Sequence, residues 1–164
     1  MGIHVEEDKM PQLFGHIKIE VCDDEGNIIC VREKHNAIVN TGKNFILNRM
    51  ASDDVASISY CAIGIGTGGV DSSAQQIETE VHRVATIYTD SAISTLEQKW
   101  MAFFNTNVPA GSTYQITEVG LFGGGADAGS NTGTLVGWSQ FGAVPKTPGS
   151  HSLTVDYRIF VSGI

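Results

Sequence analysis

The stretch SLTVDYRIFV, residues 152–161, alternates apolar and polar side chains as far as Ile159. A period of two residues places successive side chains on opposite faces of a strand, so this stretch predicts a half-buried β-strand. One face carries the apolar set and the other carries Thr154, Asp156 and Arg158. The apolar set, which we expect to face the core, is Leu153, Val155, Tyr157, Ile159 and Val161.

The same period recurs through most of the chain. GHIKIEVC and IICVREK flank the turn-forming cluster DDEGN and predict a hairpin near the N-terminus. Further strands are predicted in ISYCAIGI, RVATIYT, LEQKWMAFFNT, YQITEVGLF and TLVGWSQF. About seven or eight strands with turns between them predict an all-β, mainly antiparallel fold, either a β-sandwich or a barrel-like domain.

One segment departs from this period. In NTGKNFILNRMA, the spacing of apolar residues predicts a short helix near residues 42–51, capped by Asn40 or Thr41. Its apolar stripe, which we expect to lie on a sheet, is Ile46 and Met50 with Phe45 and Leu47. Residues 1–12 are polar without periodicity and are predicted to be a flexible N-terminal arm. Residues 13–164 are predicted to form a single β-rich domain.

A glycine-rich loop raises the possibility of nucleotide binding. AIGIGTGG, residues 62–69, fits the dinucleotide pattern G-x-G-x-x-G through Gly64, Gly66 and Gly69. That function requires a parallel βαβ unit, and the possible helix from Ser73 to Val81 is short for such a crossover. We therefore expect a connection between antiparallel strands, in which glycine permits positive φ angles and close approach of another backbone.

Residues with reactive side chains do not assemble into a recognisable active site. Glu118 lies inside the apolar strand segment TEVGLF, where a carboxylate can be catalytic or can pair structurally with Arg83, Arg158 or Lys146. We favour the structural alternative, and we interpret Glu80 and Arg83 as an ion pair at a strand entry. The histidines and cysteines lack zinc-type spacing. We predict no catalytic residue, no cofactor and no metal.

Two cysteines of the predicted hairpin need a separate check. If EGN forms a three-residue loop, Cys22 and Cys30 lie opposite each other, and a disulfide between them is conceivable. Two free thiols that are buried and pack as small apolar residues are the alternative that we favour.

The charge balance excludes some partners. The net charge is −8 and the sequence has no basic cluster, so we expect no nucleic-acid binding. No apolar run approaches the length of a membrane span, so we expect no membrane association.

Five segments in order resemble a known family. HNAIVNTGKNFILNRMA, ISYCAIGIGTGG, ETEVHRV, ITEVGLFGG and FGAVPKTPGSHSLTVDYRIFVSG follow one another as in a group of small virion structural proteins of tailed bacteriophages. The resemblance covers about residues 13–164. It implies a non-enzymatic β-rich shell or fibre component and transfers no catalytic residue.

Within that family, the expected function is that of a capsid cement or decoration protein that binds the outer capsid surface and stabilises the head. The expected location is the virion, assembled in the host cytoplasm. The expected partners are the major capsid protein or another virion structural protein and further copies of this chain, with a trimer favoured. The candidate interface residues lie in the arm and the glycine loop: Met1, Ile3, Val5, Met10, Gln12, Gly66, Thr67 and Gly68.

Two alternatives stay open. One is a tail, baseplate or fibre-attachment component of similar fold. The other is a β-sandwich that binds a carbohydrate or another small ligand, in which exposed aromatic side chains such as Trp138 and Tyr114 would stack on the ligand.

Overall fold

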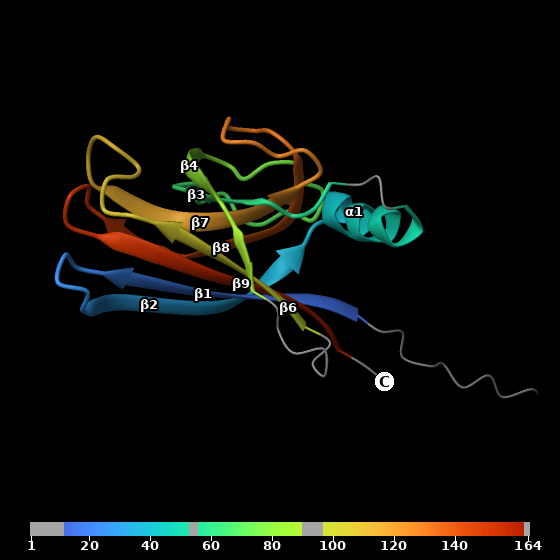
Figure 1. Cartoon of the computed structure of the whole chain (residues 1–164), viewed down its shortest axis with the longest axis horizontal. Coiled ribbons are helices and arrows are strands. Elements are labelled where there is room, and N and C mark those ends of the chain that lie inside the picture. The colour runs from blue at the N-terminus through green and yellow to red at the C-terminus, as the bar shows by residue number, and fades with distance from the viewer. Residues whose placement is uncertain (1–11, 53–55, 90–96, 163–164) are drawn as a thin grey trace, which may run out of the picture.

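The protein is an antiparallel β-barrel with one helix at its end (Figure 1). The computed structural model describes residues 12–52, 56–89 and 97–162. The strands are β1 (Gln12–Cys22), β2 (Ile28–Ile38), β3 (Tyr60–Gly64), β4 (Glu80–Ala85), β5 (Ile87–Thr89), β6 (Glu97–Phe104), β7 (Tyr114–Gly123), β8 (Thr134–Lys146) and β9 (Ser152–Ser162). The helix is α1 (Asn40–Ala51). The predicted all-β, mainly antiparallel, barrel-like class is confirmed.

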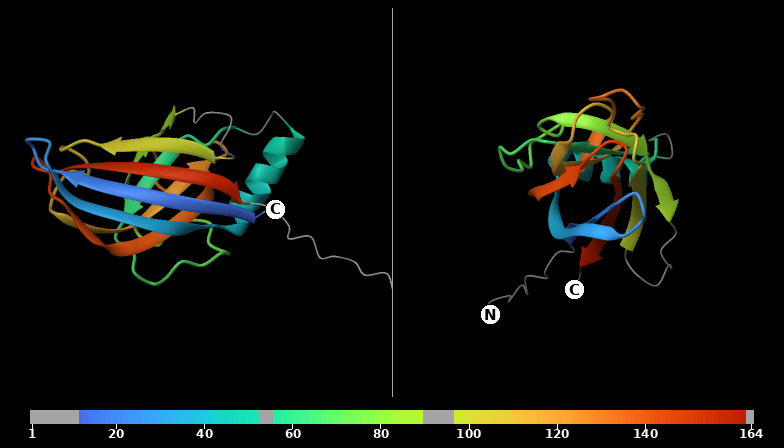
Figure 2. Two further views of the ribbon diagram at one scale, coloured as in Figure 1. Left: turned by 90° about the horizontal axis from the view of Figure 1, so that it is seen from below. Right: turned by 90° about the vertical axis from the view of Figure 1, so that its left-hand side faces the viewer.

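The strand order explains how the sheet closes on itself. Neighbours in the nine-stranded sheet follow the order β4-β3-β7-β8-β2-β1-β9-β6-β5. The two strands at its ends, β4 and β5, are consecutive in the chain and are separated by Thr86 alone. One continuous segment therefore pairs with β3 at one edge and with β6 at the other. The end-on view in Figure 2 shows the resulting ring of strands.

The core lies inside this ring and follows the alternation of the strands. On β9, Leu153, Val155 and Tyr157 are at most 1% exposed, and Ile159 is 7% exposed. These residues lie opposite the buried inward face of β1, as in the pairs Leu153 with Val21 and Val155 with Ile19. The predicted face of this strand is confirmed, although Val161 at its end is 36% exposed.

The helix differs from its prediction at both its start and its buried face. It starts at Asn40, and Val39 is the N-cap, without a side-chain cap hydrogen bond. The predicted cap was wrong: the Thr41 hydroxyl instead donates to the carbonyl oxygen of Leu135. The buried residues are Gly42 and Phe45, whereas Leu47 and Met50 are exposed. The helix lies at one end of the barrel (Figure 1), and only part of its predicted apolar stripe is buried.

The turn between β1 and β2 separates the two cysteines. It covers the five residues 23–27 rather than three. The Asp23 carboxylate accepts hydrogen bonds from the backbone N–H groups of Glu25 and Asn27 and so holds the turn in shape. A register shift then places Cys30 opposite Val21, and Cys22 opposite Ile28. Neighbouring strand positions face opposite sides, so Cys22 and Cys30 project from different faces of the sheet. Both are free, so the facing arrangement was wrong, and the expected burial holds only in part, since both are partly exposed while Cys30 packs against the core.

Within the described residues, no helix has the length and apolar character needed to cross a membrane.

Candidate functional site

The glycine loop surrounds a buried carboxylate that belongs to the protein itself. Glu118 of β7 is fully buried. Its Oε1 accepts hydrogen bonds from the backbone N–H of Gly66 at 2.9 Å and of Thr79 at 2.7 Å. Its Oε2 accepts from the backbone N–H of Glu78 at 3.0 Å and from the Trp138 indole Nε1 at 3.0 Å. Four donors therefore satisfy the carboxylate, and none of them is a cation, so the predicted pairing of Glu118 with Arg83, Arg158 or Lys146 was wrong.

Close approach to this carboxylate explains two of the glycines. A Cβ atom on Gly66 would lie 2.5 Å from the Glu78 Cβ and 2.7 Å from the Glu118 Oε1. A Cβ atom on Gly64 would also collide with the Glu118 side chain. At the third glycine of the pattern the reason is conformational, since Gly69 has φ +102° and an open surrounding.

The strands around the loop differ from a dinucleotide-binding unit. β3 pairs antiparallel with both β4 and β7, so the loop lies in no parallel βαβ crossover. The segment from Ser73 to Thr79 contains turns and bends, and Glu80 already belongs to β4, so the possible helix is absent there. The backbone donors that a phosphate would need point at Glu118 instead.

The outer part of the loop is held by a second set of polar contacts. The Glu78 Oε2 accepts hydrogen bonds from the Gly68 N–H at 2.5 Å and from the Gln140 Nε2 at 3.1 Å. The Gly69 N–H donates to the Gln140 Oε1 at 2.8 Å. The loop is thus anchored to β8 as well as to β7, which gives it a defined shape on the surface.

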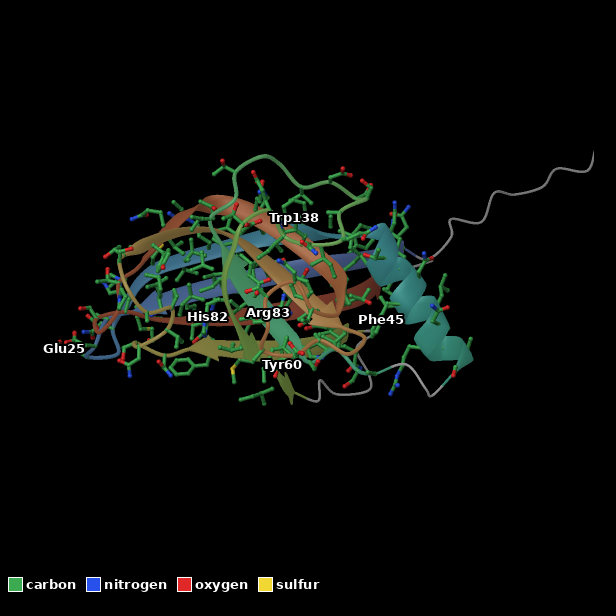
Figure 3. The ribbon with its side chains drawn as sticks, turned by 90° about the horizontal axis from the view of Figure 1, so that it is seen from above. Glu25, Phe45, Tyr60, His82, Arg83 and Trp138 are labelled. Atoms are coloured by element: carbon green, nitrogen blue, oxygen red, sulfur yellow. The ribbon has the colours of Figure 1, made fainter. Side chains whose placement is uncertain are left out.

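Trp138 has a different environment from the one expected for a ligand-stacking residue. It is 4% exposed and packs with Phe122 and Leu135 in a small cluster on the outer side of β7 and β8. Figure 3 shows it near the middle of the molecule, away from the Glu25 hairpin tip. The expectation of an exposed stacking surface at Trp138 was wrong. Tyr114 is partly buried, at the start of β7.

The predicted ion pair between Glu80 and Arg83 is confirmed, and it is buried. Two guanidinium nitrogens of Arg83 donate to the two carboxylate oxygens of Glu80 at 2.6 Å each. The Arg83 guanidinium also lies 4.4 Å from the centre of the Phe122 ring. The Arg83 Nη1 donates to the Thr132 carbonyl oxygen at 2.9 Å. Arg83 therefore connects β4 to the loop between β7 and β8.

A buried lysine at the end of β8 holds two turns together. Lys146 is fully buried, and its Nζ donates to the carbonyl oxygens of Asn105 and His151 at 2.9 and 2.5 Å. Burial lowers the pKa of this ammonium group, because desolvation disfavours its charged form. Lys146 therefore anchors two turns.

The candidate interface residues are distributed over two places. Met1, Ile3, Val5 and Met10 lie outside the described residues. Gln12 is exposed at the start of β1. In the glycine loop, Gly66 is buried, whereas Thr67 and Gly68 are exposed and available for contact. Their role in an interface stays a prediction.

Two features were not anticipated from the sequence. One is a cavity of about 560 Å³ beside α1, lined by Phe45, Ile46, Arg49, Met50, Ser57, Ile58, Gln98 and Trp100. The other is the unequal pairing of β2, whose strand ladder to β8 comprises Ala37 and Ile38 alone. Among the described residues, no group of His, Cys, Asp and Glu side chains is arranged to hold a metal ion.

Fold and site together define a nearly closed antiparallel barrel whose buried charged side chains hold its connecting loops in place. No family model, curated protein or solved structure matches this chain.

Proposed function

We propose that this chain is a non-enzymatic structural protein of a tailed-bacteriophage virion that binds the outer surface of the capsid and cements neighbouring subunits. The ordered sequence segments that resemble such proteins supply the class. The observation that carries a structural role is the saturation of Glu118 by four donors. A carboxylate in that state has its lone pairs engaged and holds a loop in place.

Charge and shape are consistent with an external position. A net charge of −8 disfavours contact with packaged DNA. The fastened glycine loop presents Thr67 and Gly68 on the surface, where a loop with small side chains allows a partner backbone to approach closely. A cement protein needs such preformed contact surfaces, since a rigid loop loses little entropy on binding.

A tail, baseplate or fibre-attachment component is the alternative within the same class. Fractionation of virions into heads and tails, followed by immunodetection of this chain, separates the two. Recovery with heads supports the cement function, and recovery with tails replaces it by the tail function.

A binding assay with undecorated heads tests the proposed contact surface. We expect the unmodified protein to co-sediment with heads and Thr67→Arg to lose most of this binding. Ser130→Arg is the matched control, because Ser130 is also exposed and lies on another loop. Equal loss in both variants, or loss in neither, would remove the glycine loop from the interface.

The cavity beside α1 favours a second candidate function, the binding of an apolar small ligand. Phe45, Ile58 and Trp100 line it, and its volume of about 560 Å³ is within the range of small-molecule sites. An environment-sensitive apolar dye provides the test. A saturable signal that Ile58→Trp abolishes would support this function, and a signal unaffected by that variant would exclude the cavity.

A further inference from the structure

The strand β2 has an open edge along most of its length. Its residues from Ile28 to Asn36 pair with β1 on one side. On the other side, the ladder to β8 comprises Ala37 with Trp138 and Ile38 with Gly137. Within the described chain, Ile28–Asn36 therefore have no strand partner facing β8. Exposed backbone of this kind accepts a further strand readily.

The two faces of this edge differ in chemistry. The side shared with Glu20 and Lys18 carries exposed apolar residues, with Ile29 46% and Val31 39% exposed. The other side carries Arg32 and Lys34, which lie opposite the inward-facing Ile19 and Ile17. An added strand must therefore place apolar residues on one face and acidic residues on the other.

Both cations point across the gap toward β8. The Lys34 Nζ donates to the carbonyl oxygen of Gln140 at 2.7 Å. The Arg32 Nε lies 3.8 Å from the position that a Cβ atom on Gly142 would take. Neither side chain forms an ion pair within the described part of the chain. These two positive charges are a recognition feature for carboxylates entering the gap.

The sequence contains a segment of this chemistry outside the described residues, IHVEED at residues 3–8. Aligned in parallel with β2, it places apolar residues beside apolar residues and acidic residues beside basic ones. The pairs are Ile3 with Ile29, Val5 with Val31, Glu6 with Arg32 and Asp8 with Lys34. Glu7 falls beside Glu33 on the solvent side, where Lys18 lies opposite Glu33 and offsets the repulsion.

We propose that residues 3–8 of a second copy of this chain add to β2 as a parallel strand. The chain's own residues cannot reach this register. Lys34 lies opposite Ile17, five positions along β1 from Gln12. Asp8 beside Lys34 would then lie about 16 Å along the strands and about 10 Å across them from Gln12, roughly 19 Å in all. Four residues span at most about 14 Å.

Exchange of this segment between copies closes the open edge and produces a symmetric oligomer. Each copy donates one segment and accepts one, so reciprocal exchange closes a dimer and cyclic exchange closes a larger ring. This inference concerns contacts between copies of the chain and does not depend on the virion function proposed above.

Two variants that reverse the charges, one in residues 3–8 and one in β2, provide the test. In one full-length variant, Glu6→Lys is combined with Asp8→Lys; in the other, Arg32→Glu is combined with Lys34→Glu. Each variant places like charges across the proposed contact, so we expect a monomer by light scattering at concentrations where the unmodified protein is oligomeric. Lys43→Glu on α1 is the control charge reversal and should leave the oligomer intact.

Mixing the two variants restores complementary charges wherever a copy of one variant meets a copy of the other, as at every contact of a dimer or another even-numbered ring. We therefore expect the mixture to return to the mass of the unmodified oligomer if that oligomer has an even number of copies, and to form a dimer or another even-numbered ring if it has an odd number. Misfolding of either variant could give neither result. The inference is overturned if the unmodified protein is monomeric, if either variant remains oligomeric alone, or if the mixture stays monomeric. Circular dichroism of each variant confirms that its strand content is unchanged.

Discussion

The Trp138 indole nitrogen and the Glu118 carboxylate lie 3.0 Å apart in the interior of the protein, joined by a hydrogen bond between β8 and β7. The same carboxylate accepts three backbone N–H groups from the loop between β3 and β4. One side chain thus connects two strands of the barrel with the conformation of a surface loop, and the loop's stability should depend on it.

Replacing Glu118 by Ala removes the acceptor from four donors in a buried site. We expect the free energy of unfolding to fall by about 3–5 kcal/mol, because buried donors without acceptors retain the full cost of desolvation. Urea denaturation measures this loss. The control is Glu78→Ala, whose exposed carboxylate should contribute about 1 kcal/mol. Equal losses in the two variants would contradict the anchoring role of Glu118.

The glycines of the loop should differ in their tolerance of a methyl group. In Gly66→Ala the new Cβ would overlap with Glu78 and Glu118, and we expect a loss of about 1–3 kcal/mol from the forced displacement. Gly69→Ala meets no atom within 4 Å and is strained by its φ of +102° alone, so we expect a loss of about 1 kcal/mol. Thermal unfolding of both variants gives the comparison, and the reverse order would refute the packing explanation.

Nucleotides should not stabilise the protein, although the loop matches a dinucleotide pattern. Its Gly66 N–H already donates to Glu118, and its Gly68 N–H to Glu78. A ligand that binds the folded state must raise the melting temperature. We therefore expect no change in that temperature with millimolar NAD or ATP, and a rise of several degrees would show that nucleotide binds.

The two ends of the apolar face of β9 should respond differently to truncation. Ile159 is 7% exposed, and its replacement by Ala should cost about 2–5 kcal/mol through lost burial and the resulting cavity. Val161 is 36% exposed, and its replacement should cost less than about 1 kcal/mol. Chemical denaturation of the two variants measures both values. A loss below about 1 kcal/mol at Ile159 would contradict its position in the core.

Alkaline pH should destabilise the protein through Tyr157. Burial raises the pKa of its phenol well above the ordinary value of 10.0, so the neutral form is favoured in the folded state. The unfolded chain releases this proton first, and the free energy of unfolding should fall as pH rises above about 10. The difference in pH slope between the unmodified protein and Tyr157→Phe isolates this contribution. Identical slopes would show that Tyr157 ionises normally in the folded protein.

Part of the site was predictable from the sequence. Glu118 in an apolar strand indicated a buried, partnered carboxylate, and the spacing of Glu80 and Arg83 indicated their ion pair. The failed expectations concern the α1 residues Leu47 and Met50, which are exposed, and the ligand-binding alternative fails at Trp138, which is buried. Burial at these positions depends on how far neighbouring elements extend over them, and a local sequence pattern does not contain that information.

The sequence by itself determined which faces of the strands enter the core, because alternation along a strand is a local property of the chain. The partners of Glu118 were decided by the tertiary structure. Its donors Gly66, Thr79 and Glu78 precede it by 52, 39 and 40 positions, and Trp138 follows by 20. The open edge of β2 has the same origin, since the β8 ladder ends where the two strands diverge. Hydrogen bonds act over about 3 Å in space, so barrel closure, rather than sequence spacing, selects the groups that meet.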